Sequence, residues 1–496
     1  MSNVSAYLLG QAQKSYHNVS TADHPLLQMR EIAQAALADG GVHPRHVDAI
    51  ACVDPLSWTY AELAKKVSAS IGCNNKVREF WKPAGGTTPQ DLLHDIAASM
   101  QKGELDVAII VGAEAMRTRR KAVRAGQDLD WPERDKSVSP MRGQRPFTSE
   151  WEAQHGLRLP IQLFPLLENA IRHANARSAE EQINIAAGLL HKNARVASDN
   201  PHAWFQDAPS AKEIASVTSD NRMIAYPYSK RMNAIMDVDQ AAAILVVSDR
   251  YLDSDSAQRE RAVAVLGGAG AEEVWNPIQR QSLSKCLAME AALKSTIKKG
   301  GLHVDEIDAF DFYSCFPAPI ELALDALKID LADPRPFSIT GGLAYAGGPG
   351  NNYVMHALAS AVTKLRENPT ERILVTGVGM ANTKHAATLL SHAENIPEGA
   401  TGVTEYRLET DNRPLKLQTK ATGTCSVVSY TIEYNRDGDP VNVIYILDTQ
   451  DGERAIANVS DPEAAARQIL ESDPIGRSGE LTWDENQQKQ FFNLQA

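Results

Sequence analysis

The chain has 496 residues, 43% apolar and 23% charged, which is enough for about two to four globular domains with sizeable cores. Its formal net charge of −12 argues against a general binder of nucleic acid or of membrane surfaces, because such proteins carry a basic excess. No apolar stretch approaches the roughly 20 residues that cross a bilayer, and the five cysteines contain no CxxC pair that would indicate a disulfide framework or a zinc site. We therefore expect a cytoplasmic protein without a metal ion.

The N-terminal part alternates helical and strand patterns. Residues 26–40 ("LLQMREIAQAALADG") predict a helix, and residues 48–54 ("DAIACVD") predict a buried strand. A glycine pair, Gly85 and Gly86, then opens an apolar helix that leads to another buried strand. Such a turn is typical of a nucleophile or an anion site at a helix N-terminus. Residues 84–90, however, contain no Cys, Ser or His.

A polar, irregular insertion at residues 117–225 interrupts this alternation. It begins with five basic residues in a run of eight and contains a strong helical pattern, "PLLENAIRHANARS", at residues 165–178. We interpret the insertion as a loop domain that lies over the site.

The alternation then repeats in the C-terminal part. Residues 301–314 ("GLHVDEIDAFDFYS") resemble residues 41–54 ("GVHPRHVDAIACVD"), an offset of 260 residues. The stretch "GGPGNNYVMHALASAV" matches "GGTTPQDLLHDIAASM", and "RILVTGVGMA" matches "DVAIIVGAEAM" at nearly the same offset. A repeat of this size predicts two similar α/β domains with the site where they meet.

After about residue 393 the pattern changes to short strands separated by Asp-Gly turns. One helix follows, with Ser460 or Asp461 as its N-cap, and two last strands complete a small module that we expect to be OB-like. The predicted domains are residues 1–250 with the insertion at 117–225, residues 260–393, and residues 410–496.

Over residues 4–393 the chain resembles the thiolase superfamily, specifically the sterol-carrier-protein-type thiolases and thiolase-like proteins. The motifs that carry this resemblance are "GGTTPQ", "VGAEAM", "FPLLENAIRHA", "YPYSKRMNAIMDVDQAAAILVVS", "DFYSCFP", "GGLAYAGGPGNNYVMHA" and "VTGVGMANTKHA". The resemblance implies an α/β duplicated thiolase fold, with two βαβαβαββ halves in a layered αβαβα arrangement plus a small C-terminal all-β OB-like module. It also implies an acyltransferase of the acetyl-CoA acetyltransferase kind, acting on coenzyme A thioesters in lipid metabolism.

The resemblance places the site, and each motif departs from the thiolase pattern. Gly85 stands where a thiolase has its nucleophilic cysteine, and Gly348 stands where the GHP histidine activates it. Val375 replaces the second, acid–base cysteine, and the loop that supports the oxyanion site reads Tyr-Ser-Cys-Phe at residues 313–316. Because a glycine cannot form an acyl-enzyme, we expect non-canonical thiolase activity or none.

Several groups of this site are candidates for the remaining chemistry. The glycines Gly85, Gly86, Gly348 and Gly377 are the candidate oxyanion and acyl pocket, since oxyanion stabilisation needs backbone N–H donors and no side chain. The candidate catalytic side chains are Cys315, His385, Tyr313 and Tyr345, each with an ordinary packing role as the alternative.

The loop domain of thiolases grips the CoA nucleotide, and arginine forks favour phosphates. The resemblance therefore makes Arg117, Arg119, Arg120 and Lys121 the candidate nucleotide-binding residues, with a solvated basic helix face as the alternative. The expected ligand is coenzyme A or an acyl-CoA, with no covalently bound cofactor, no metal and no nucleic acid. A homodimer is a further expectation, because thiolases pair through their N-terminal halves.

His94 and His356 occupy equivalent positions in the two repeated helices. We expect them to be buried and hydrogen-bonded to each other.

Three functions stay open at this point. The first is a thiolase-like acyl-CoA-binding protein of the acyltransferase family with unusual chemistry. The second is a retro-aldolase that cleaves β-hydroxyacyl-CoA, since aldol cleavage needs a base and a stabilised enolate but no thiolate. The third is a non-catalytic acyl-CoA binder.

Overall fold

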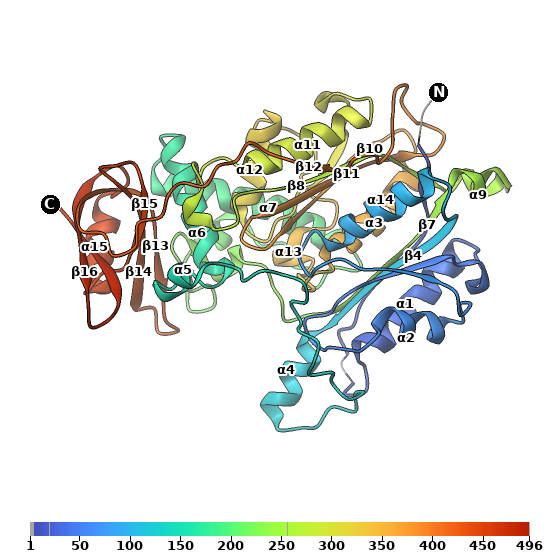
Figure 1. Cartoon of the computed structure of the whole chain (residues 1–496), viewed down its shortest axis with the longest axis horizontal. Coiled ribbons are helices and arrows are strands. Elements are labelled where there is room, and N and C mark those ends of the chain that lie inside the picture. The colour runs from blue at the N-terminus through green and yellow to red at the C-terminus, as the bar shows by residue number, and fades with distance from the viewer. Residues whose placement is uncertain (1–3, 19, 255, 496) are drawn as a thin grey trace.

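A large α/β body carries a smaller β domain at one end in the computed structural model, which describes residues 4–18, 20–254 and 256–495 (Figure 1). None of the described helices combines the length and the apolar character that a bilayer crossing requires.

The N-terminal half follows the predicted alternation of helices and strands. Its elements are β1 (Ala6–Ser15), α1 (Pro25–Asp39), β2 (Ala49–Val53), α2 (Leu63–Ile71), β3 (Arg78–Phe80), α3 (Thr88–Gln101), β4 (Val107–Ala115) and β7 (Asp239–Ser248). Every residue of β7 is buried, because this strand lies between β4 and β1 in the middle of the sheet and is covered on both faces. Short helices α9 (Asp249–Ser254) and α10 (Ser256–Arg259) lead into the second half.

The C-terminal half repeats the first in both order and geometry. Its elements are β8 (Val263–Glu272), α11 (Leu287–Lys299), β9 (Ala309–Asp311), α12 (Pro317–Leu327), α13 (Gly342–Tyr345), α14 (Tyr353–Glu367), β10 (Arg372–Gly379) and β11 (Lys384–His392). Where the first half has β3, the second has an irregular segment: Pro336 and Phe337 accept main-chain hydrogen bonds of 2.9 Å from Phe310 and Phe312.

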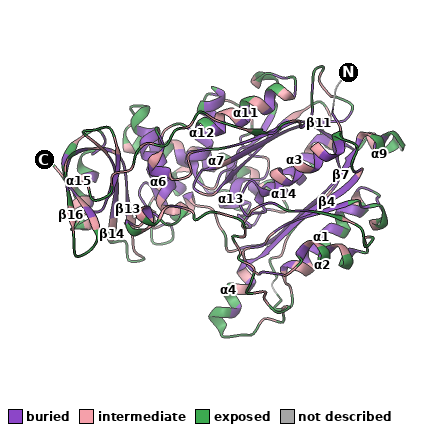
Figure 2. Cartoon of the chain, viewed as in Figure 1, coloured by how far each residue is buried: buried purple, intermediate pink, exposed green. Residues whose placement is uncertain are grey.

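The strand order shows the duplication directly. The order is β3-β2-β4-β7-β1 followed by β8-β11-β10-β9, so the two halves are mirror images in strand sequence and meet where β1 pairs antiparallel with β8. Helices α3 and α14 lie between the two half-sheets, α1 and α2 cover one outer face, and α11 and α12 cover the other (Figure 1). The central helices and strands are buried almost throughout (Figure 2). This layered arrangement confirms the predicted fold class.

The expectation for the paired histidines is half wrong. Both are buried, but His94 on α3 lies 3.0 Å from Thr388 on β11, and His356 on α14 lies 3.1 Å from Gln13 on β1. Each central helix therefore bonds to a strand of the opposite half, because the helices are sandwiched between the two sheets. The histidines join the halves instead of joining each other.

The C-terminal module has the strand connections of an OB barrel, as predicted. Its elements are β13 (Gly423–Tyr434), β14 (Pro440–Thr449), β15 (Arg454–Ala457), α15 (Pro462–Glu471), β16 (Ser478–Asp484) and β17 (Lys489–Leu494). The sheet order is β15-β14-β13-β16-β17, and a parallel bridge from Asn458 to Phe491 brings the two ends together. Asp461 is the N-cap of α15: its carboxylate accepts a 3.0 Å hydrogen bond from the main chain of Ala464.

The insertion holds this module against the body, which the sequence does not predict. Its elements are α4 (Met116–Ala125), α5 (Glu150–Gln154), α6 (Pro160–Ala174), α7 (Ala179–Asp199), α8 (Ala211–Ala215) and β5 (Met223–Ala225), and β6 (Tyr228–Ser229) follows it. Strand β5 pairs with β13 at Ala225 and Glu433. Asn169 of α6 donates a 2.9 Å hydrogen bond to the carbonyl of Tyr430, and Ser429 donates one of 2.6 Å to the carbonyl of Leu166.

The predicted domain bounds stay predictions, and limited proteolysis tests the last of them. The linker, residues 394–413, carries a two-residue strand, β12 (Arg407–Leu408), that pairs with β8, whereas the side chains of Asp411 and Arg413 are 90% and 85% exposed. We expect the protease Asp-N, which cuts before aspartate, to cleave first at Asp411. Because α6 and β5 pack against β13 and form hydrogen bonds with it, the two fragments should still elute together on gel filtration and separate only in denaturant. Early cleavage inside residues 423–494 would contradict the proposed boundary.

Candidate functional site

The turn that begins α3 lies where strands and loops of both halves converge. A Cβ atom added to Gly86 would overlap the carbonyl oxygen of Val378 at the end of β10. It would also lie 2.7 Å from the hydroxyl oxygen of Tyr313. The space beside Gly86 is therefore filled by residues of the other half. A Cβ on Gly377 would in turn lie 3.4 Å from the carbonyl oxygen of Gly86.

Tyr313 is held rigidly beside this turn. Its main-chain N–H donates a 2.8 Å hydrogen bond to the hydroxyl of Thr376. Its ring packs edge-on against Tyr353, with 5.4 Å between ring centroids and 88° between planes. Burial raises the pKa of the Tyr313 phenol well above its usual range. The phenol is therefore neutral at physiological pH, so it acts as a hydrogen-bond donor and is a poor base.

The α3 turn also offers main-chain donors. No described residue supplies a hydrogen-bond acceptor for the N–H groups of Gly86 and Thr87. These groups stand at the positive end of a helix, where an anionic or polarised oxygen is stabilised. The insertion covers the turn from outside: Gln144 donates to the carbonyl of Ala84, and Ala84 donates a 3.3 Å main-chain bond to Arg142.

Three predicted site residues converge on a different segment, residues 231–235, which follow the insertion. The main-chain N–H of Gly348 donates a 2.8 Å hydrogen bond to Ile235, and the carbonyl of Cys315 accepts one of 3.0 Å from Ala234. The hydroxyl of Tyr345 donates a 3.3 Å hydrogen bond to the carbonyl of Arg231. Burial raises the pKa values of the Cys315 thiol and the Tyr345 phenol. The structure thus groups Cys315, Tyr345 and Gly348 apart from the Gly86–Tyr313 contact.

His385 lies on β11, behind the turn of residues 84–87 that begins α3 and that we call the elbow. It shares with Tyr313 and Gly377 the lining of a closed, mainly apolar void of about 10 Å³, which is just room for one water molecule. Its Nε2 atom faces the thiol of Cys286 at 3.2 Å, a contact between residues 99 positions apart that the sequence does not reveal. Burial lowers the pKa of His385 to about 4, so its ring is neutral at pH 7.

The four basic candidates share α4 but differ in their surroundings. The guanidinium of Arg117 lies 5.3 Å from the ring of Trp204, and Arg120 forms a 3.4 Å ion pair with Asp237. Arg119 and Lys121 form no ion pair with any described residue. Burial and the neighbouring guanidinium groups of Arg134 and Arg120 lower the pKa of Arg119.

Two buried carboxylates that hold the site together escape the sequence reasoning. Asp311 accepts hydrogen bonds from Ser338, Thr340 and Tyr353, which ties the strand before Tyr313 to α14. Glu114 accepts bonds from the main chain of residues 56 and 57, and burial raises its pKa to about 7. A signal for Glu114 was present in "VGAEAM", since a charged residue ending a fully apolar strand is rarely buried without a role.

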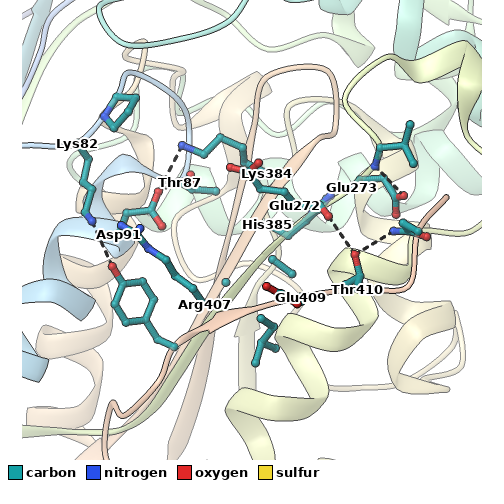
Figure 3. Close-up of a pocket in the computed structure, with 17 residues that line it drawn as sticks. Lys82, Thr87, Asp91, Glu272, Glu273, Lys384, His385, Arg407, Glu409 and Thr410 are labelled. Atoms are coloured by element: carbon teal, nitrogen blue, oxygen red, sulfur yellow. Dashed lines mark hydrogen bonds and ion pairs between the residues drawn. The ribbon is translucent and has the colours of Figure 1, made fainter. Parts of the chain in front are cut away.

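A larger cavity of about 680 Å³ lies beside the elbow (Figure 3). Its lining comes from the segment before and in α3, the end of β8, the start of β11 and the linker. From the first of these the lining residues are Lys82, Pro83, Thr87 and Asp91, and from the linker they are residues 406–410 and Asn412. Lys82 pairs with Asp95 at 2.5 Å and Lys384 with Asp91 at 3.6 Å along its wall. Among the described residues, no group of three or more His, Cys, Asp or Glu side chains is arranged to hold a metal ion.

Replacing Gly86 with Ala is expected to destabilise the fold by about 2–3 kcal/mol, because the added methyl group overlaps Val378 and crowds Tyr313. Urea unfolding followed by circular dichroism measures the change. Gly188→Ala is the matched control, since a Cβ at that position of α7 meets nothing within 4 Å and alanine favours a helix by roughly 1 kcal/mol. Equal effects of the two replacements would show that the turn does not pack as described.

Comparison with known proteins agrees with this architecture. Residues 409–486 match the family model of the thiolase-like protein type 1 additional C-terminal domain. A monomeric SCP2-thiolase like protein type 1 from Mycobacterium smegmatis is similar over 99% of both chains, with 26% identity and a TM-score of 0.81. None of the curated protein sequences matches the chain significantly.

Two more distant structures share the fold alone. The Ltp2–ChsH2(DUF35) aldolase is 18% identical over 80% of this chain and 100% of its own, with a TM-score of 0.60. A human mitochondrial 3-ketoacyl-CoA thiolase in complex with CoA is 14% identical over 79% of this chain and 98% of its own, with a TM-score of 0.56. The chain is therefore a protein of the thiolase fold that carries the additional C-terminal domain of thiolase-like protein type 1.

Proposed function

We propose that the cleft between the two halves binds the thioester end of an acyl-CoA without forming an acyl-enzyme at the elbow. The observation that carries this proposal is the neutral Tyr313 hydroxyl beside Gly86, next to main-chain N–H groups that no described residue accepts. Together they supply fixed hydrogen-bond donors for a thioester carbonyl. The elbow itself contains glycine in place of a thiol, so the carbonyl is bound but not attacked there.

The nucleotide end of the ligand is assigned to α4. Arg119 and Lys121 have no ion-pair partner among the described residues and are available to CoA phosphates, whereas Arg117 and Arg120 are partly engaged. The similar thiolase whose structure contains CoA supports this type of ligand. The similar protein from Mycobacterium smegmatis is described as monomeric, and the homodimer expected from the sequence stays a prediction.

A retro-aldolase on β-hydroxyacyl-CoA is the second candidate, and the same tyrosine favours it. A neutral phenol at Tyr313 can donate a hydrogen bond to the enolate oxygen that aldol cleavage generates. The phenol cannot also serve as the base, because its pKa is raised. Release of an aldehyde or ketone from a β-hydroxyacyl-CoA would establish this reaction. Binding without release would leave the protein a non-catalytic binder.

Calorimetric titration with acetyl-CoA and with CoA tests the primary proposal. We expect Tyr313→Phe to weaken acetyl-CoA binding about fivefold and to leave CoA binding unchanged, because one hydrogen bond to the carbonyl is lost. Arg119→Ala with Lys121→Ala should weaken both ligands equally, and less so at high salt. Arg124→Ala, at the end of the same helix, is the control. An absence of binding by the wild-type protein up to millimolar acetyl-CoA would overturn the proposal.

A further inference from the structure

A thiol, an imidazole and a carboxylate form a cluster that the elbow does not use. The Sγ atom of Cys286 lies 3.2 Å from Nε2 of His385 and 3.5 Å from a carboxylate oxygen of Glu273. Cys286 is the N-cap of α11, His385 lies on β11, and Glu273 directly follows β8. Three separate elements of the C-terminal half thus bring a nucleophile and a base within hydrogen-bond reach of each other.

This cluster borders the large cavity. His385 and Glu273 line its wall (Figure 3). Cys286 is not part of the lining: it contacts both of these side chains and has 7% of its surface exposed. The opposite wall is the linker segment with β12. The thiol is therefore close to a space large enough for a small molecule and is shielded from bulk water.

The two side chains are within reach of direct proton transfer. Burial raises the pKa of the Cys286 thiol and lowers that of His385 to about 4, so both groups are neutral at pH 7. The Asn382 carbonyl lies 3.1 Å from the same Nε2 atom, so His385 accepts the thiol proton there only in the tautomer that carries its hydrogen on Nδ1, and the carbonyl then accepts the new Nε2–H. Nδ1 of His385 is buried and has no hydrogen-bond partner among the described residues.

Two charged neighbours act on the thiol in opposite directions. The Arg280 guanidinium is 3% exposed and donates to Ala381 and Thr383 without a carboxylate partner within 4 Å among the described residues. Burial and the Glu273 carboxylate raise the pKa of the Cys286 thiol, and the positive charge of Arg280 lowers it in part. Arg280 is therefore the neighbour that favours the thiolate.

The main-chain N–H groups near Cys286 determine which reaction its thiol can perform. Acyl transfer needs N–H groups for an oxyanion, but the main-chain N–H of Ala288 in the first turn of α11 is already taken by Glu273 at 3.3 Å. Thiol–disulfide exchange passes through no oxyanion and requires only a thiolate, a leaving thiol and access. The geometry therefore favours exchange with a disulfide over acylation.

We propose that Cys286 is a thiol–disulfide exchange site for small-molecule disulfides, with His385 as its base. His385 takes the proton from Sγ, and the thiolate attacks one sulfur of the disulfide. A new S–S bond to Cys286 forms as the original S–S bond breaks, and the leaving thiolate receives the proton from His385. One disulfide is consumed and one thiol is released, so no further oxidant is required.

The cavity wall sets a charge preference for the disulfide. Two lysines of the wall are neutralised by ion pairs, Lys82 by Asp95 and Lys384 by Asp91. The charged groups that remain are the carboxylates of Glu272, Glu273 and Glu409 and the guanidinium of Arg407. Three negative groups against one positive favour a cationic disulfide over an anionic one of equal length. Cystamine and dithiodipropionate are such a pair.

Peptide mapping by mass spectrometry of the full-length protein after brief exposure to cystamine tests the proposal. Exposure alone would direct the reagent to Cys73 and Cys315, which are less buried. We expect Cys286 to be modified about tenfold faster than either, and cystamine to react faster than dithiodipropionate in the wild-type protein. Cys286→Ser should abolish the fast phase.

His385→Gln is expected to slow modification of Cys286 roughly 100-fold, as loss of a general base does. His392→Gln is the matched control, because His392 is equally buried on the same strand and bonds instead to the carbonyl of Glu260. Preferential labelling of Cys73 or Cys315 would overturn the proposal, as would a faster reaction with dithiodipropionate. An unchanged rate in His385→Gln would overturn the role of the base. The comparison of cystamine with dithiodipropionate uses only the wild-type protein, so it tests the exchange proposal even if His385→Gln unfolds.

Discussion

Purified protein is expected to cleave acetoacetyl-CoA with free CoA at least ~10⁴-fold more slowly than a thiolase assayed beside it, because loss of a nucleophile and its base costs several orders of magnitude. Glycine occupies both positions, and the N–H of Gly348 is bonded to Ile235 instead of facing the elbow. Spectrophotometric loss of the acetoacetyl-CoA enolate measures the rate. Treatment with iodoacetamide should leave any residual rate unchanged.

The structure also predicts that a single replacement will not restore the activity. A Cβ at residue 348 would lie 3.2 Å from the carbonyl of Ile235, so a histidine there requires its neighbour to move, and it would still face a glycine at residue 85, the nucleophile position. We expect Gly348→His to remain inactive in the same assay. A rate within about 100-fold of a thiolase would contradict the placement of these glycines. A residual rate that iodoacetamide abolishes would point to Cys315 or Cys286.

The sequence predicts the architecture well, because the architecture depends on local patterns. Apolar strands and Gly-Gly turns at a nearly constant offset are sufficient to infer two similar halves, and the strand order confirms this inference. The Asp-Gly turns likewise predict the C-terminal β module, and Asp461 is the N-cap that its short polar side chain suggests.

The sequence predicts the site only in part, because its contacts join distant segments. The role of Tyr313 stays a prediction, and its contact with Gly86 arises only because the second half approaches the turn. The partner of His385 is Cys286, which no motif singles out, and the two meet only because β11 passes the start of α11. Docking of α6 and β5 on β13 is hidden for the same reason.

Replacing Asp311 with Ala is expected to destabilise the protein by about 3–5 kcal/mol, the cost of breaking a buried charged network. Its carboxylate is fully buried and accepts five hydrogen bonds of 2.9 to 3.1 Å, from the side chains of Ser338, Thr340 and Tyr353 and from the main chain of residues 339 and 340. Burial raises the pKa of Asp311 although these donors lower it. Removal of the carboxylate would take the shared acceptor from five donors and leave only the weaker network among the hydroxyls of Ser338, Thr340 and Tyr353.

Loss of the Asp311 carboxylate should impair ligand binding at the elbow as well as the stability of the fold. Asp311 is the last residue of β9, two positions before Tyr313, and its hydrogen bonds fix the segment that leads to α13 and Gly348. We expect Asp311→Ala to abolish acetyl-CoA binding at temperatures where circular dichroism still shows folded protein. Asp308→Ala is the control: this exposed carboxylate three residues earlier accepts one main-chain bond of 2.8 Å from Arg372 and should cost about 1 kcal/mol. Equal melting temperatures and equal acetyl-CoA affinities for Asp311→Ala and Asp308→Ala would contradict this prediction. They would show that the hydrogen bonds of Asp311 do not position Tyr313 beside the elbow.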